Sequence, residues 1–177
     1  MVGPLGALVG DVARFLHLFS EHSRGRLLVG CKADAEMATI LIVDDISSNR
    51  DPIAKLLQLE GHRSVMAENG REALRILDEQ PIDAVLLDLM MPEMDGVSFL
   101  RRLRQEGKHG HVPVIVLSAL RYGDAVDQAH ALGAKAVLLK AQFTFADLMM
   151  TLRRVMSQRS VTDLVADAQS QSWTQTG

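Results

Sequence analysis

Short runs of aliphatic residues alternate with longer amphipathic segments along residues 39–157. The short runs have the length and branching of β-strands and lie at residues 40–43, 63–66, 84–87, 114–117 and 136–139. The longer segments carry apolar residues at helical spacing and lie at residues 48–59, 69–79, 97–104, 124–132 and 143–156. Five strands that alternate with five helices predict an α/β fold with a doubly wound parallel sheet.

One residue constrains the first of these helices. Pro52 lies within the segment 48–59, and a proline in a helix interior costs about 3 kcal/mol. We therefore expect Pro52 to lie near the start of that helix, whose first residue the pattern does not fix.

The alternating pattern also divides the chain into a domain at residues 37–157, an N-terminal extension at 1–36 and a polar tail at 158–177. Apolar residues in the extension fit one helical stripe, which would suit docking or dimer contact. The alternative is that the natural start is Met37, so that residues 1–36 are an upstream addition, or that these residues form a mobile leader. We favour this alternative because the segment Met37-Ala38-Thr39 resembles a natural start and immediately precedes the first strand.

Composition narrows the function classes. The chain has 177 residues, 47% of them hydrophobic, and a net charge of −3, which argues against a nucleic-acid-binding protein. Its longest apolar runs are far shorter than the roughly 20 residues of a membrane span. Cys31 is the only cysteine, which agrees with a cytoplasmic protein. Residues 28–31 look like a lipoprotein cleavage box, but Arg24 and Arg26 interrupt the apolar segment that such a box requires.

Polar residues follow four of the five predicted strands. The first strand ends in Asp44 and Asp45, the third in Asp88, the fourth in Ser118 and the fifth in Lys140. The carboxyl ends of parallel strands share one edge of the sheet, where such folds bind their ligands. Three carboxylates, a hydroxyl and an ammonium are therefore expected together at this edge of the sheet, which we call the mouth of the site.

The negative charges at this mouth require a cation to balance them. Three carboxylates in close proximity raise one another's pKa unless a cation relieves the repulsion. Oxygen ligands select Mg²⁺ or Ca²⁺ over zinc, and a shallow site that retains water fits Mg²⁺. Lys140 and Ser118 suit the oxygens of a phosphoryl group, and Asp88 can act as a nucleophile that forms an aspartyl phosphate.

With these residues in place, the chain resembles the receiver domain of two-component response regulators. The resemblance covers about residues 39–157 and is carried by ILIVDD at 40–45, VLLDLMMPEMDG at 85–96, VIVLSA at 114–119 and GAKAVLLK at 133–140. It implies a flavodoxin-like sheet with strand order 2-1-3-4-5. It also implies a phosphorylation switch whose partners are a histidine kinase or phosphotransfer protein and a separate effector. Such a domain signals and is not an enzyme beyond its own phosphorylation and slow dephosphorylation.

The resemblance also assigns roles to individual residues. Asp88 would be the phosphoacceptor. Asp45, Asp88 and the backbone carbonyl of Met90 would ligate Mg²⁺, with Asp44 acting through water. Ser118 and Lys140 would bond the phosphoryl oxygens.

Two positions depart from the family pattern. Ala141 stands where receivers usually have a proline after a cis bond, and a cis bond before alanine would cost about 3 kcal/mol, so we expect a trans bond. Val137 stands where the fifth strand often carries an aromatic residue that reports phosphorylation. These departures support an alternative, a docking module that works without phosphorylation. A metal-dependent phosphatase is disfavoured because Met90 occupies the position of its catalytic acid.

The residues around the acidic mouth suggest a long-lived phosphoryl group. Met90 and Leu120 are expected to flank the path of hydrolytic water, and both are apolar. We therefore predict slower dephosphorylation than in receivers with polar residues at these two positions.

Overall fold

The computed structural model describes residues 37–105, 108–119 and 123–158. The expectations for the extension at 1–36, for Cys31, for Leu120 and for the tail beyond residue 158 fall outside these residues. Within the described chain, strands and helices alternate in the order β1 Thr39–Val43, α2 Ser47–Leu59, β2 Arg63–Ala67, α3 Gly70–Glu79, β3 Ala84–Asp88, α4 Gly96–Gln105, β4 Val114–Ser118, α5 Asp124–Ala131, β5 Ala136–Leu139 and α6 Phe145–Ser157.

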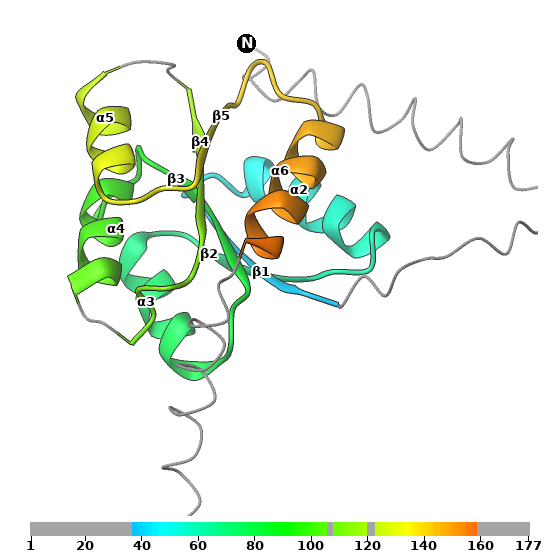
Figure 1. Ribbon diagram of the computed structural model, residues 1–177, viewed down its shortest axis with the longest axis horizontal. Helices are drawn as coiled ribbons and strands as arrows, with labels where there is room; N and C mark the ends of the chain where they lie inside the picture. Colours follow the sequence, from blue (N-terminus) through cyan, green and yellow to red (C-terminus); the bar gives the residue numbers. More distant parts are fainter. Residues whose placement is uncertain (1–36, 106–107, 120–122, 159–177) are drawn as a thin grey trace, which may run out of the picture.

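The five strands form one parallel sheet in the order β2-β1-β3-β4-β5. This confirms the predicted strand order and the doubly wound α/β fold. Helices α3, α4 and α5 cover one face of the sheet, and α2 and α6 cover the other (Figure 1). Strand order reverses between β1 and β3, so the carboxyl ends of these two strands lie at the position where folds of this class bind ligands.

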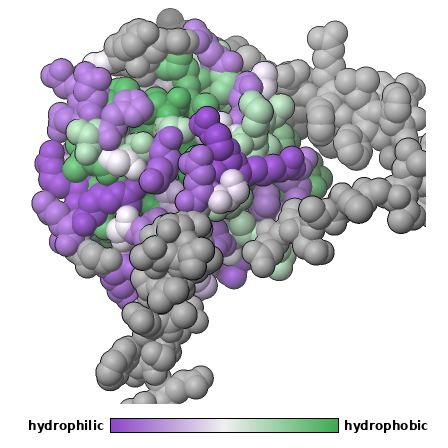
Figure 2. All heavy atoms as spheres, in the orientation of Figure 1, coloured by the Kyte–Doolittle hydropathy of each residue, from purple (hydrophilic) through white to green (hydrophobic). Residues whose placement is uncertain are grey.

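Two apolar cores follow from the alternation of side chains along the strands. In β1, Leu41 and Val43 face the core beneath α3, α4 and α5, whereas Ile40 and Ile42 face the core beneath α2 and α6. All five residues of β3 and of β4 are buried, which explains why these strands read as continuous apolar runs. Edge strand β5 is only half-buried. It lies between α5 and α6 on the face seen in Figure 2, where hydrophobic and hydrophilic residues are interspersed.

Local chemistry sets the helix ends, and the first residues of α6 and α2 bear on the expectations from the sequence. Helix α6 begins at Phe145, two residues later than predicted, because Thr144 and Asp147 form a reciprocal capping box. Helix α2 begins at Ser47, so Pro52 is its sixth residue and lies in the second turn, not the first. The missing amide hydrogen of Pro52 removes only the bond to the carbonyl four residues earlier.

No helix in the described part of the chain has both the length and the apolar character needed to span a membrane.

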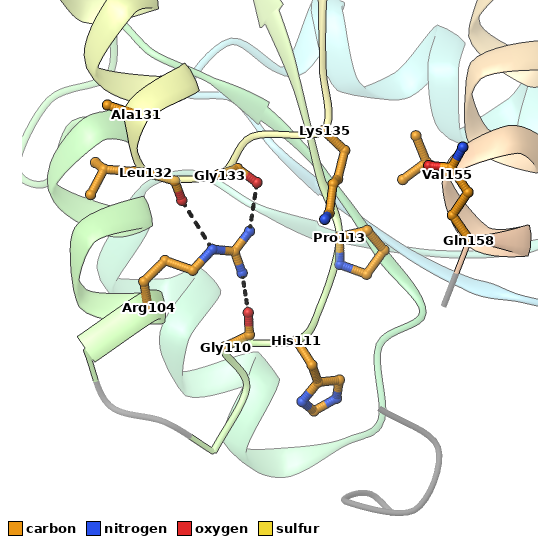
Figure 3. A pocket seen from close by; sticks show the side chains of 10 residues that line it. All are labelled: Arg104, Gly110, His111, Pro113, Ala131, Leu132, Gly133, Lys135, Val155 and Gln158. Atoms are coloured by element: carbon orange, nitrogen blue, oxygen red, sulfur yellow. Dashed lines mark hydrogen bonds between the residues drawn. The ribbon is translucent and has the colours of Figure 1, made fainter. Parts of the chain in front are cut away.

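At the amino ends of β4 and β5, Arg104 joins three chain segments. Its Nε donates to the carbonyl of Leu132 at 3.1 Å, and its Nη2 to that of Gly133 at 3.3 Å. Its Nη1 donates to the carbonyls of Gly110, at 2.5 Å, and Val112, at 3.0 Å. Arg104 and residues of these segments line a pocket of about 520 Å³. Figure 3 shows the guanidinium among the lining residues, with its bonds to Leu132, Gly133 and Gly110 dashed. Arg104 therefore links the end of α4 to the segment after α5 and to the loop before β4.

This position suits a cation because four carbonyls converge on it, two at the carboxyl end of α5 and two in the loop before β4. The carboxyl ends of helices carry partial negative charge and lack intrahelical donors. Burial lowers the pKa of the Arg104 guanidinium, but an arginine remains charged at physiological pH. The pocket at this end of the sheet is thus lined by a structural cation.

Replacing Arg104 with Met should lower the free energy of unfolding by about 2 kcal/mol or more, because several partly buried carbonyls lose a charged donor. Urea unfolding followed by circular dichroism measures the change. Arg71→Met, at an exposed position on α3, is the matched control and should change the free energy of unfolding by less than about 0.5 kcal/mol. Equal effects of the two substitutions would contradict the structural role of Arg104.

Candidate functional site

Three carboxylates meet at the carboxyl ends of β1 and β3. Asp44 and Asp45 directly follow β1, and Asp88 is the last residue of β3. One carboxylate oxygen from each residue lies within 4.8 Å of the others. Asp44 and Asp88 are buried, whereas Asp45 is exposed at the mouth. The prediction that these three side chains share one edge of the sheet is confirmed.

Lys140 lies between two of the carboxylates. It directly follows β5, and its buried Nζ lies 2.6 Å from Oδ2 of Asp44 and 2.7 Å from Oδ2 of Asp88. One ammonium against three carboxylates leaves two negative charges, which is the charge that a single divalent cation neutralises. Because all the acidic ligand atoms are oxygens, the donor set fits Mg²⁺ and does not resemble a zinc site.

Burial and charge act in opposite directions on these groups. Burial raises the pKa of Asp88 above its ordinary value, although the hydrogen bond and charge of Lys140 pull it down. A raised pKa means that folding favours the protonated acid. Without a cation, the folded protein therefore loses stability as pH rises through the range in which Asp88 ionises. Burial by itself would lower the pKa of Lys140, but its bonds to Asp44 and Asp88 outweigh this and raise it, so the ammonium stays charged.

Ser118 and Met90 complete the predicted set at the same edge. Ser118 is the buried last residue of β4, and its backbone carbonyl accepts a 2.8 Å bond from the amide of Lys140. The amide of Met90 donates to Oδ1 of Asp88 at 3.3 Å. The Met90 side chain is 72% exposed, and we call this apolar position, two residues after Asp88, the apolar rim of the site.

Helix α4 begins against the backbone of the central acid. A Cβ atom on Gly96 would lie 2.3 Å from the carbonyl oxygen of Asp88 and 2.8 Å from Cα of Leu89, so only glycine fits there. Asp95 caps the helix, because its Oδ1 accepts from the amide of Ser98 at 2.8 Å.

Two buried polar residues of α2 contact the site and were not found from the sequence. Asn49 Nδ2 lies 3.0 Å from Oδ1 and 3.1 Å from Oδ2 of Asp44. The guanidinium of Arg50 donates to the carbonyl of Asp44 and, at 3.0 Å, to Oε1 of Glu68. A signal was present, because Asn49 precedes the buried Ile53 by four residues and so continues the apolar stripe of α2.

The two departures from the family pattern lie on and beside β5. The bond between Lys140 and Ala141 is trans, as are all peptide bonds of the described residues, which confirms that expectation. Val137 is half-buried and packs against the core beneath α3, α4 and α5.

Comparison with known proteins agrees with this geometry. The family model of the response regulator receiver domain matches residues 40–153 of this sequence. This chain belongs to the response regulator receiver family. Its strand order and the three acids of its mouth are those expected of a receiver, and such an acidic group is typical of a receiver's Mg²⁺ site.

Individual receivers resemble the chain to different extents. The chemotaxis protein CheY4 of Vibrio cholerae is 32% identical with a TM-score of 0.63, over 68% of this chain and 99% of CheY4. The response regulator TrrA of Thermotoga maritima, solved in complex with Mg²⁺ and BeF, is 30% identical with a TM-score of 0.60, over 67% of this chain and 99% of TrrA.

A longer relative also matches. The sensory/regulatory protein RpfC of Xanthomonas campestris is 30% identical over 168 residues, which are 86% of this chain and 22% of RpfC. The chain thus spans about a fifth of that relative's length.

Substituting Gly96 with Ala should weaken both folding and Mg²⁺ binding. The added methyl group must displace the Asp88 backbone, a change that typically costs about 1–3 kcal/mol. The control is Gly61→Ala, where φ is +86° and no atom lies within 4 Å of the added Cβ. The control should lose stability through backbone strain alone and keep its Mg²⁺ affinity. Calorimetric titration with Mg²⁺ and urea unfolding separate the two effects, and an unchanged Mg²⁺ affinity in Gly96→Ala would contradict the expectation.

Proposed function

We propose that this receiver accepts a phosphoryl group on Asp88, with Mg²⁺ bound, from the phosphohistidine of a histidine kinase or phosphotransfer protein. The observation that carries the proposal is the buried Lys140 ammonium between Asp44 and Asp88, with the exposed Asp45 beside them. Family membership supports the reaction class. The similarity to TrrA, which was solved with Mg²⁺ and BeF, supports the choice of metal.

The proposed transfer is a displacement at phosphorus. A carboxylate oxygen of Asp88 forms the new bond, and the bond from phosphorus to the histidine nitrogen breaks, so that the nitrogen keeps the electron pair and takes up a proton. Bound Mg²⁺ would supply charge neutralisation for the transferring group. Asp45, Asp88 and the backbone carbonyl of Met90 would hold the ion, with Asp44 acting through water. Ser118 would donate its hydroxyl to the phosphoryl group.

Lys140 has a defined part in this proposal. In the structure its ammonium is shared between Asp44 and Asp88. Once Asp88 is phosphorylated, the acyl phosphate carries phosphoryl oxygens in place of one carboxylate charge, and Lys140 would pair with one of them. The resulting shift in β5 and the loop around Ala141 would change which separate effector protein the receiver binds. Its purpose is thus signalling, and its cytoplasmic location remains a prediction from the sequence.

A docking module that works without phosphorylation is the second candidate. Val137 favours it because an aromatic residue that reports phosphorylation usually stands there in this family, and Ala141 favours it because it replaces the family's usual proline. The complete charged group at the mouth favours the switch. The two candidates differ in one measurable property, which is whether phosphorylation of Asp88 changes partner affinity.

Incubation with Mg²⁺ and acetyl phosphate should add the mass of one phosphoryl group, visible by intact-protein mass spectrometry. Asp88→Asn should abolish the adduct, because it removes the nucleophilic oxygen. Asp127→Asn, at an exposed position on α5, should keep it. Removal of Mg²⁺ with a chelator should also abolish it. An adduct that persists in Asp88→Asn would reject Asp88 as the phosphoacceptor.

Replacing the exposed Met90 with Asn should shorten the lifetime of the phosphoryl group several-fold, because an amide at the rim can orient the attacking water. Loss of the mass adduct with time, after removal of acetyl phosphate, gives both rates. Met66→Asn, at an exposed position in β2, is the control and should not change the rate. If Met90→Asn and wild type lose the adduct equally fast, the apolar rim does not set the lifetime.

A further inference from the structure

The Asp44 carboxylate accepts hydrogen bonds from three different residues. Oδ1 accepts from the amide of Ile46 at 2.9 Å and from Asn49 at 3.0 Å. Oδ2 accepts from Lys140 at 2.6 Å and from Asn49 at 3.1 Å. The Asn49 amide thus reaches both oxygens of the carboxylate. It contacts the same oxygen that binds Lys140, the residue proposed to move toward the phosphoryl group.

A second contact holds the backbone of the same residue. Arg50 follows Asn49 in the first turn of α2, and its guanidinium bonds the carbonyl of Asp44. The charge of Arg50 is balanced by Glu68, which begins the loop between β2 and α3. Both Asn49 and Arg50 are buried, although the other buried residues of α2 are apolar. Burying two polar side chains is costly unless hydrogen bonds compensate, and here both are directed at Asp44.

We infer that Asn49 is a positioning residue for the Mg²⁺ site, with Arg50 fixing the backbone of the same acid. The inference rests on the proposed function. Asn49 keeps the Asp44 carboxylate oriented toward the metal when Lys140 leaves it. An amide suits this task because it is neutral. A lysine or arginine in its place would orient Asp44 equally well, but would also cancel one of the two excess negative charges that attract the cation.

Asn49 and Arg50 differ in the atoms that they contact, and therefore in their effect on the charge of the site. The Arg50 guanidinium is directed at a backbone carbonyl and at Glu68, so its charge is balanced outside the group of three acids. The Asn49 amide is directed at the carboxylate itself. Residues that orient a metal's ligands commonly contribute on the order of 10–100-fold to metal affinity. An effect at the lower end is expected here, because Ile46 also donates to Asp44.

The test compares Mg²⁺ binding by wild type, Asn49→Ala and Gln58→Ala, the last being an exposed amide on the same helix. Calorimetric titration should show about 10-fold weaker Mg²⁺ binding for Asn49→Ala and no change for Gln58→Ala. The Mg²⁺ concentration that gives half-maximal phosphorylation by acetyl phosphate should rise by the same factor, while the rate at saturating Mg²⁺ changes little. A general loss of structure would lower the saturating rate as well.

A second variant guards against a folding defect. Asn49→Asp keeps the size of the side chain, loses its donor and adds a negative charge near the site. If orientation of Asp44 matters, Asn49→Asp binds Mg²⁺ more weakly than wild type despite the extra charge. If Asn49 only fills space and does not orient Asp44, the added charge makes Mg²⁺ binding tighter. That result would overturn the inference. Urea unfolding without Mg²⁺ verifies that each variant is folded.

The outcomes distinguish this inference from the proposed function. Wild type that binds no Mg²⁺ and takes up no phosphoryl group would overturn both. Wild type that does both, alongside an Asn49→Ala protein with unchanged Mg²⁺ affinity, would overturn only the assignment of Asn49.

Discussion

The ion pair that Lys140 makes with Asp44 and Asp88 is the interaction on which the organisation of the site depends. It connects the ends of three strands, β1, β3 and β5, and two of these are not neighbours of β5 in the sheet. A buried ion pair seldom adds net stability, because removing charges from water costs several kcal/mol per ion. Its position at the mouth of the sheet is therefore explained better by function than by stability.

The two ends of the sheet differ in their electrostatics. At the carboxyl ends, carboxylates outnumber the ammonium that pairs with them, which leaves a surplus of negative charge. At the amino ends of β4 and β5, the guanidinium of Arg104 is surrounded by neutral carbonyls at the end of α5 and in the loop before β4. The first arrangement suits an added cation, and the second already contains one. Among the described residues, this difference explains why the acidic end supports a metal site and the end with the Arg104 pocket does not.

The sequence was sufficient to predict the elements that depend on a local pattern. It was insufficient to predict the residues whose burial depends on a tertiary contact. The apolar runs placed all five strands to within a residue at each end, and the residues after them located Asp44, Asp88 and Lys140 at one edge. Asn49 and Arg50 were missed, since a polar residue in an amphipathic pattern indicates solvent exposure by default. Their burial follows from a tertiary partner, Asp44. In the described residues, the buried Nε of Arg50 has no acceptor, a cost of about 1–3 kcal/mol that no local pattern predicts.

The close approach of Gly96 to Asp88 has a mechanical consequence. The first turn of α4 is in contact with the main chain of the acid, with no space for even a methyl group between them. Packed atoms transmit small displacements, because protein interiors have low compressibility. Any strain on the backbone at the end of β3 therefore passes directly to a helix whose outer side faces solvent. The absence of one carbon atom thus brings the backbone of the buried acid into direct contact with a surface helix.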